Sequence, residues 1–248
     1  MTGRLLRSPL PGLLLIAVLW WCLVPALHID PRFLPALGAV LADGYGVWPD
    51  LAVSFWHTLV ETLLGFLLGC LFGIGGGILF ACSRWLERGL LPLFVALQSV
   101  PVIAFGAIVV IWCGNGMLSK VVIALYLSFF PITVSTLRGL QSADAARCAL
   151  LESFGASRMQ LFLRLQLPTA LPGIMIGLKV GIALALAGAI VGEWFGDTVG
   201  LGVMLLQALY VEQVTRVWVL ILASGALGAL LYGAIALVER RFVWWRSA

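Results

Sequence analysis

Long uninterrupted runs of apolar residues constrain this chain more than any other feature. They occupy about residues 10–27, 55–82, 91–113, 117–137, 170–192 and 217–238. Each run has roughly the 20 residues that are needed to cross the hydrocarbon core of a bilayer. Only helices and closed barrels satisfy their backbone hydrogen bonds in lipid, and continuous apolar runs differ from the alternating pattern of barrel strands. We therefore expect an all-α integral membrane protein with six transmembrane helices.

The composition supports this interpretation and adds an expected orientation. The chain is 62% hydrophobic and 10% charged, whereas soluble domains are about 45–50% apolar and about 25% charged. If both termini lie on one side, that side holds Arg4, Arg7, Arg84, Arg88, Arg138, Arg147, Arg158, Arg164, Arg240, Arg241 and Arg246. The other side holds Arg32, Lys120 and Arg216, and Lys179 lies within or near a span. Because cytoplasmic loops are rich in Lys and Arg, we expect both termini to be cytoplasmic. The net charge of +4 then indicates contact with anionic membrane lipid and no nucleic acid partner.

The first apolar run has two interpretations. Arg4 and Arg7 precede it and Val24-Pro25-Ala26 follows it, which is also the form of a secretory signal. We favour a retained span, with Trp20 and Trp21 towards the outer interface. The expected organisation is an amino-terminal helix and outer loop (1–50), a transmembrane domain of five helices (51–241) and a basic aromatic cytoplasmic tail (242–248).

Glycines recur at helical spacing in two of the expected spans. One set is Gly65, Gly69, Gly73 and Gly77, and the other is Gly173, Gly177 and Gly181. Small residues four apart allow two helix backbones to approach closely in lipid. We expect these glycines to pack helices, because no GK[ST] follows the run at 73–77 and a phosphate loop is therefore excluded.

A polar stretch between the fourth and fifth apolar runs predicts a helical hairpin. Helix-forming residues at 143–153 lead to Gly155, which is placed to end the helix in the left-handed conformation. Ser157 with Gln160 three residues later has the form of a capping box, and Pro168 is expected to stop the second helix. Met159, Leu161, Phe162 and Leu165 would form its apolar stripe. From composition alone, a helix that rests on lipid headgroups is an equal alternative.

The spacing from Gly155 to Leu165 and then to Leu167-Pro168 resembles the EAA loop of permease subunits of bacterial ABC importers. Six short sequence segments are similar to the nitrate, sulfonate, taurine and bicarbonate class of that family. They lie at 119–122, 129–132, 138–140, 154–157, 167–173 and 177–179. Ala149-Leu150-Leu151 stands where the family has Glu-Ala-Ala or a close variant. The resemblance implies a coupling loop at about 138–169, with ATPase contacts from Glu152, Ser153, Phe154, Gly155, Ala156, Ser157, Arg158, Phe162, Leu167 and Pro168.

The same resemblance implies a type I ABC importer permease in a bacterial inner membrane. Its partners would be a cytoplasmic ABC ATPase dimer, a periplasmic or lipid-anchored solute-binding protein, and a second permease copy. The chain itself would hold no cofactor, because ATP and Mg²⁺ would bind to the ATPase. We expect no catalytic residue and no metal site: the five cysteines are scattered, and GxSxG and HExxH are absent. A self-contained secondary transporter is the first alternative and a polytopic membrane enzyme the last.

Four polar residues in the spans are candidates for the substrate pathway or its gate: Glu61, Gln98, Asn115 and Glu193. An ionisable residue inside a span is by default a functional candidate. Glu61 follows His57 by four residues, and its alternatives are an interfacial position or a pair with Lys120. Pro101 is expected only to bend its helix, and Lys179 to reach the inner interface or to pair with an acid. The substrate would be a nitrate-, sulfonate- or taurine-type anion or an aromatic heterocycle. The phrase Gly192-Glu193-Trp194-Phe195-Gly196, together with Glu61, resembles importers of thiamine-precursor pyrimidines or riboflavin-like compounds.

Overall fold

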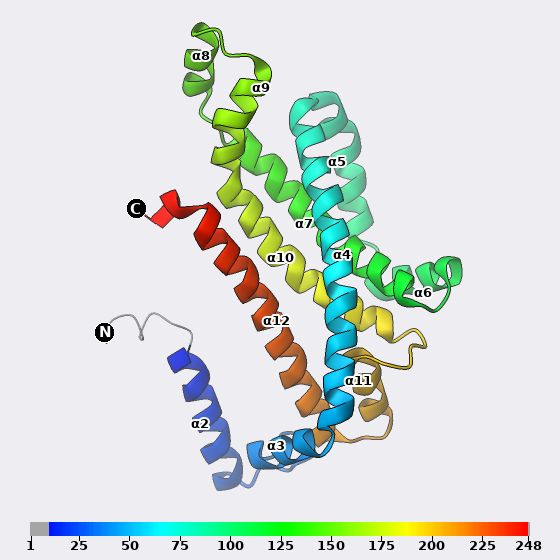
Figure 1. Cartoon of the computed structure of the whole chain (residues 1–248). Helices are drawn as coiled ribbons and strands as arrows, with labels where there is room; N and C mark the ends of the chain where they lie inside the picture. Colours follow the sequence, from blue (N-terminus) through cyan, green and yellow to red (C-terminus); the bar gives the residue numbers. More distant parts are fainter. Residues whose placement is uncertain (1–9, 248) are drawn as a thin grey trace.

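The computed structural model describes residues 10–247, and regular structure within that range is entirely helical (Figure 1). The helices are α2 (Leu10–Ala26), α3 (Leu37–Gly46), α4 (Trp48–Cys82), α5 (Arg84–Gln98), α6 (Val102–Cys113), α7 (Met117–Gln141), α8 (Ala145–Ser153), α9 (Arg158–Leu161), α10 (Leu167–Glu193), α11 (Leu201–Tyr210) and α12 (Val214–Phe242). A π-helical turn (Phe162–Gln166) joins α9 to α10, and a 3₁₀ turn (Trp244–Ser247) follows α12.

Four long apolar helices account for the main membrane-crossing segments of the described residues. They are α4, α7, α12 and the continuous helix Arg158–Glu193, which includes α9 and α10. The first expected span is α2, an apolar helix of 17 residues. At 1.5 Å per residue it is about 25 Å long, slightly shorter than a hydrocarbon core of about 30 Å.

The expected third span, 91–113, is not one helix. It is divided into α5 and α6, whose axes differ by 97°. Pro101 precedes α6 as its N-cap, because proline has no N–H and its ring disfavours helical geometry at Val100. Tyr126 of α7 contacts both sides of the break. On the α5 side, Gln98 donates to its carbonyl at 3.4 Å and its hydroxyl donates to the Leu97 carbonyl. On the α6 side, the Phe105 ring stacks on the Tyr126 ring, with centroids 3.9 Å apart. Pro101 therefore contributes to a break in the span, where only a bend was expected.

The centre of the bundle is α7, which packs between α4 and α10. Gly65, Gly69, Gly73 and Gly77 of α4 contact Ala124, Ser128, Ile132 and Thr136 of α7. On the other side of α7, Gly173, Gly177 and Gly181 lie against Gly139, Ser135 and Ile132. A Cβ atom added to Gly73 would lie 2.8 Å from Ile132 Cβ. The spacing of glycines thus sets how closely both neighbours approach α7.

The prediction that Pro168 stops the second hairpin helix is wrong. Pro168 occupies the first turn of α10, and the helix continues from Arg158 to Glu193. The π-helical turn allows this, because its wider turn places the Leu167 N–H on the Phe162 carbonyl and shifts the hydrogen-bond register ahead of the proline. The Thr169 hydroxyl also donates to the Leu165 carbonyl at 2.7 Å. A proline at this position is tolerated without a break.

Candidate functional sites

The first candidate site is the hairpin formed by α8 and α9, which projects beyond the ends of α7 and α10 (Figure 1). Asp144 caps α8 by accepting from the Ala146 N–H at 2.9 Å. Gly155 follows α8 with φ of 80°. The Gly155 N–H donates to the Glu152 carbonyl at 2.9 Å, and the Ala156 N–H donates to the Leu151 carbonyl at 3.1 Å. These two bonds form a Schellman ending, in which glycine accepts the left-handed conformation without strain.

A capping box begins the second arm of the hairpin. The Ser157 N–H donates to Gln160 Oε1 at 2.8 Å, and the Gln160 N–H donates to Ser157 Oγ at 3.3 Å. Together with the Schellman ending, it satisfies the backbone groups at both sides of the turn. The angle between the two arms is therefore fixed by hydrogen bonds within the hairpin itself.

The tip of the hairpin exposes apolar side chains. Phe154 is 80% exposed, Met159 65% and Leu150 56%. Glu152, Ser153, Gly155, Ser157 and Arg158 are also exposed, and Ala156 is half-buried. Phe162 and Leu167 instead pack against a small core formed by Leu140, Ala170 and Ile174, and Pro168 is half-buried. The predicted contact residues thus divide into an exposed tip and a base that anchors the hairpin to the bundle.

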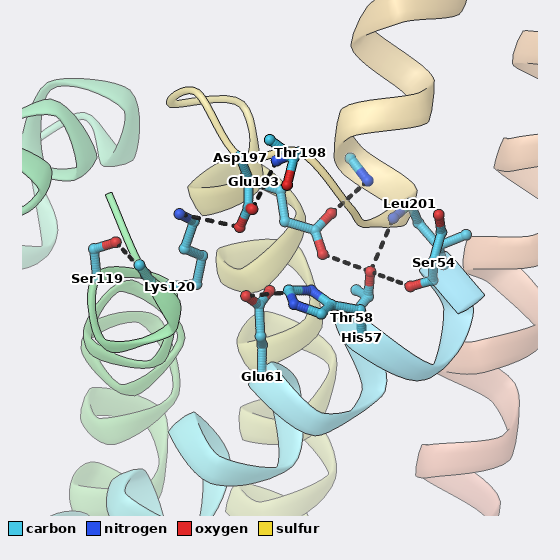
Figure 2. A network of polar contacts seen from close by, with 12 residues as sticks. Ser54, His57, Thr58, Glu61, Ser119, Lys120, Glu193, Asp197, Thr198 and Leu201 are labelled. Atoms are coloured by element: carbon cyan, nitrogen blue, oxygen red, sulfur yellow. Dashed lines mark hydrogen bonds and ion pairs between the residues drawn. The ribbon is translucent and has the colours of Figure 1, made fainter. Parts of the chain in front are cut away.

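The second candidate site is a buried polar cluster at the opposite end of the bundle (Figure 2). Glu193, the last residue of α10, is 1% exposed. Its Oε1 accepts from the Thr58 hydroxyl and its Oε2 from the Gly202 N–H, both at 2.5 Å. Thr58 Oγ1 in turn accepts from the Leu201 N–H at 2.9 Å. One carboxylate therefore joins α10, α4 and the first turn of α11.

Gly200 makes room for this carboxylate. Its backbone φ is 149°, a conformation that residues with a Cβ atom rarely adopt. A Cβ atom there would overlap the carboxyl group of Glu193. The negative charge also lies at the amino terminus of α11, where the helix dipole favours it. The Gly-Leu-Gly sequence at 200–202 is thus needed for Glu193 to occupy this position.

Glu61 lies beside Glu193, with its side chain fully buried between helices. Neither of its carboxylate oxygens has a hydrogen-bond partner, and His57 Nδ1 is buried without one as well. His57 Nδ1 lies 3.6 Å from Glu61 Oε1. The two residues share one face of α4 because they are four apart.

The expected alternative of a Glu61–Lys120 pair is not what the structure has. Lys120 is fully buried, and its ammonium group lies 3.0 Å from Asp197 Oδ2 and 2.6 Å from Asn115 Oδ1. The Asn115 amide donates to the Gly196 carbonyl. Burial alone would raise the pKa of Asp197, but the Thr198 N–H and the Lys120 ammonium hold that pKa below its ordinary value. The Lys120–Asp197 pair fixes the loop after α10 against α7.

Of the four predicted pathway residues, the structure brings Glu61 and Glu193 together and places Asn115 beside them through Lys120. Gln98 lies elsewhere, at the break between α5 and α6. Lys179 forms an ion pair with Glu239 of α12. Sequence reasoning missed Thr58 and Asp197; Asp197 follows Glu193 by four residues, but nothing local to Thr58 signals its role. It also missed the pair between Arg216 and Asp43 at 2.6 Å, which ties α12 to α3.

The helical bundle spans the membrane, carries a preformed hairpin at one end and holds a buried polar cluster at the other, an arrangement that fits a membrane transport subunit. Residues 65–244 match the family model described as binding-protein-dependent transport system inner membrane component. The chain belongs to this family, and it is a permease subunit of an ABC importer in the inner membrane. Membership of this family implies ATPase and solute-binding partners, which argues against the self-contained transporter considered above.

Similar proteins span nearly the whole chain. A probable ABC transporter permease protein of Haemophilus influenzae is 34% identical over 95% of this chain and 97% of its own. The formylaminopyrimidine transport permease protein ThiX of Halalkalibacterium halodurans is 38% identical over 80% of this chain and 81% of its own. The riboflavin transport system permease protein RibX of Chloroflexus aurantiacus is 30% identical over 96% of this chain and 90% of its own.

The fold is also found in a solved structure. A chain of the MetNI methionine ABC transporter, crystallised in inward-facing conformations, superposes with a TM-score of 0.70 at 19% identity. The match covers 79% of this chain and 98% of that chain. This similarity shows the type I permease fold.

Proposed function

We propose that the hairpin at 144–168 is the coupling element through which the partner ATPase drives this permease. The observation that carries the proposal is a preformed hairpin whose tip exposes Phe154, Met159 and Leu150. Aromatic residues and methionine are enriched in protein interfaces, and a rigid element loses little entropy on docking. The half-buried base at Phe162 and Leu167 would pass a displacement of the tip to the bundle.

The remaining assembly follows from the same proposal. Two copies of the permease form the pathway, and ATP with Mg²⁺ binds to the ATPase dimer, not to this chain. The hairpin, the connection between α4 and α5 and the end of α12 lie at one end of the bundle (Figure 1). That end is cytoplasmic in the proposal, so that both termini are cytoplasmic and the polar cluster faces the solute-binding protein. The division into residues 1–50, 51–241 and 242–248 remains part of this proposal.

ATP drives such a cycle only if its binding favours one conformation of the permease. Moving a two-state equilibrium from 1:99 to 99:1 requires about 5.5 kcal/mol of differential interaction. In this chain the hairpin is the element that would receive that interaction. Weakening its contact with the ATPase would therefore weaken transport without altering the membrane bundle.

Copurification tests the docking surface directly. We expect the Phe154→Asp permease to lose its ATPase in a tagged pull-down from mild detergent, because a buried aromatic anchor contributes about 2 kcal/mol or more to an interface, or about 30-fold in affinity. Phe33→Asp is the matched control, since Phe33 is equally exposed, at 78%, near the other end of the bundle. Mass spectrometry gives the ratio of ATPase to permease. A wild-type ratio for Phe154→Asp would contradict the proposal.

For the substrate, we propose an aromatic heterocycle of the pyrimidine type. The similarity to the formylaminopyrimidine permease, at 38% identity over 80% of the chain, supports this choice over a taurine-type anion. The taurine permease TauC of Escherichia coli is 31% identical over 64% of the chain. In cells that express the complete importer, we expect unlabelled aminopyrimidine to reduce uptake of labelled aminopyrimidine and taurine to leave it unchanged. Competition by taurine with no effect of pyrimidines would exclude this substrate class.

A further inference from the structure

Three side chains with metal-binding atoms converge inside the polar cluster. His57 and Glu61 come from α4 and Glu193 from the end of α10, and one ligand atom of each lies within 4.8 Å of the others. Glu61 is fully buried, and neither its oxygens nor the buried His57 Nδ1 has a hydrogen-bond partner. Buried polar atoms without a hydrogen bond are rare in native proteins and indicate a missing water, ion or other ligand. The carboxylate of Glu61 and the ring of His57 face one another, with Nδ1 3.6 Å from Oε1 (Figure 2).

Charge indicates which kind of ligand fits. Two buried carboxylates carry two negative charges when ionised, and burial of unpaired charge is strongly unfavourable. The ammonium of Lys120 does not neutralise Glu61, because it is paired with Asp197 and Asn115. A divalent cation bound by two carboxylates and a neutral imidazole makes the site electroneutral. A water molecule would satisfy hydrogen bonds, but only a cation would hold both carboxylates in their ionised form.

The donor set and its surroundings fit a transition-metal ion. Zn²⁺ binds imidazole nitrogen and carboxylate oxygen at about 2.0–2.2 Å, so two ligand atoms of a tetrahedral site lie about 3.5 Å apart. Side-chain displacements of about 1 Å would therefore close this site. Glu193 is already oriented by Thr58 and the Gly202 N–H, as metal-ligating carboxylates usually are by a second layer of hydrogen bonds. The His57 side chain is 30% exposed, so the proposed site lies at the edge of the buried cluster, although Nδ1 itself is buried.

We propose that His57, Glu61 and Glu193 form a binding site for one divalent transition-metal ion of the Zn²⁺ type per permease chain. The sequence alone predicted no metal site. The spacing of His57 and Glu61 on one helix face was the available signal, but the third ligand comes from another helix. A bound ion would brace α4 against the end of α10 and the start of α11. The proposal does not depend on which solute the importer carries.

Zinc binding by the purified full-length permease tests this proposal. The permease, carrying an affinity tag without histidines, is reconstituted in nanodiscs, treated with EDTA to remove bound metal ions and then titrated with Zn²⁺. We expect one Zn²⁺ per chain, and a thermal midpoint about 5–10 °C higher at a hundredfold excess over Kd. In Glu61→Gln we expect the affinity to fall by at least about 100-fold. Its metal-free midpoint should not fall, because glutamine keeps the size of the side chain and adds no buried charge.

Two further variants keep the result interpretable. Glu212→Gln makes the same change at an exposed carboxylate between α11 and α12, and it should retain the full response to Zn²⁺. His57→Gln changes a partly exposed residue and should lose the response, which provides a second test if Glu61→Gln does not fold. Absence of stoichiometric Zn²⁺ in the wild-type protein, or full binding by both ligand variants, would overturn the site. Neither outcome bears on the coupling proposal, because no transport is measured.

Discussion

A permease with Gly155 replaced by valine is expected to insert normally and to lose about 90% of its ATP-driven uptake. Gly155 has φ of 80°, and a left-handed conformation costs about 1–2 kcal/mol for a residue with a Cβ atom. The hairpin then either carries this strain or opens into another turn, and both outcomes displace Phe154 and Met159 from their docking positions. A loss of about 1.4 kcal/mol in the coupled state corresponds to tenfold. Uptake and ATP hydrolysis measured together in proteoliposomes check this result, since hydrolysis should persist without uptake.

The control for this variant is Gly155→Asn, because asparagine adopts the left-handed conformation more easily than other residues. We expect it to retain most of the uptake. Nothing in the permease lies within 4 Å of a Cβ atom at this position, so a side chain here meets no clash inside the chain itself. Normal uptake by the valine variant would remove the hairpin from the coupling mechanism.

The second large effect is expected at the contact between α4 and α7. Gly73→Leu should destabilise the permease by about 3 kcal/mol or more, because a Cβ atom would lie 2.8 Å from Ile132 Cβ and 2.9 Å from the Phe129 carbonyl oxygen. Overpacking against backbone typically has an effect of about 1–3 kcal/mol or larger, since the two helices must separate along their whole contact. The measurement is the monodisperse fraction and thermal midpoint of protein purified in one detergent.

Gly75→Leu provides the matched control in the same helix. A Cβ atom on Gly75 meets nothing within 4 Å, so a leucine side chain there would extend into open space on the helix surface. We expect a change within about 0.5 kcal/mol, as for other surface substitutions. Equal loss of folded protein in both variants would mean that any leucine is harmful in this segment and that the close contact with α7 is not responsible.

The helical class and most helix positions were predictable, because apolar runs and glycine spacing are local properties of the chain. The ends of the hairpin arms were also predictable at Gly155 and Ser157, where turn and cap chemistry involve residues three to five apart. The break after Gln98 was not, since its 97° angle depends on contacts with Tyr126 in another helix. The continuation of the helix through Pro168 was not predictable, because the π-helical turn that accommodates this proline has no local sequence signature here.

The polar cluster was also predictable only in part. The spacing of His57 and Glu61 indicated the residues from α4, but the residues from α10 and the loop after it depend on where α10 ends. From the sequence, Lys120 could have paired with Glu61. In the structure, Lys120 pairs with Asp197 instead. Which of two acids a buried cation meets is decided by helix packing, not by residue type. Clusters built from distant spans therefore require the structure.

The uninterrupted helix from Arg158 to Glu193 has a mechanical consequence. Its 36 residues make a rod about 54 Å long at 1.5 Å per residue. One end belongs to the hairpin, and the other carries the carboxylate that binds Thr58 and Gly202. In the proposed coupling mechanism, a displacement of the tip would therefore be transmitted to the far end of the bundle through one continuous helix, with no intervening loop. The irregular parts of this helix are the π-helical turn and Pro172, which removes one further hydrogen bond inside α10. Both lie towards the hairpin end of the helix.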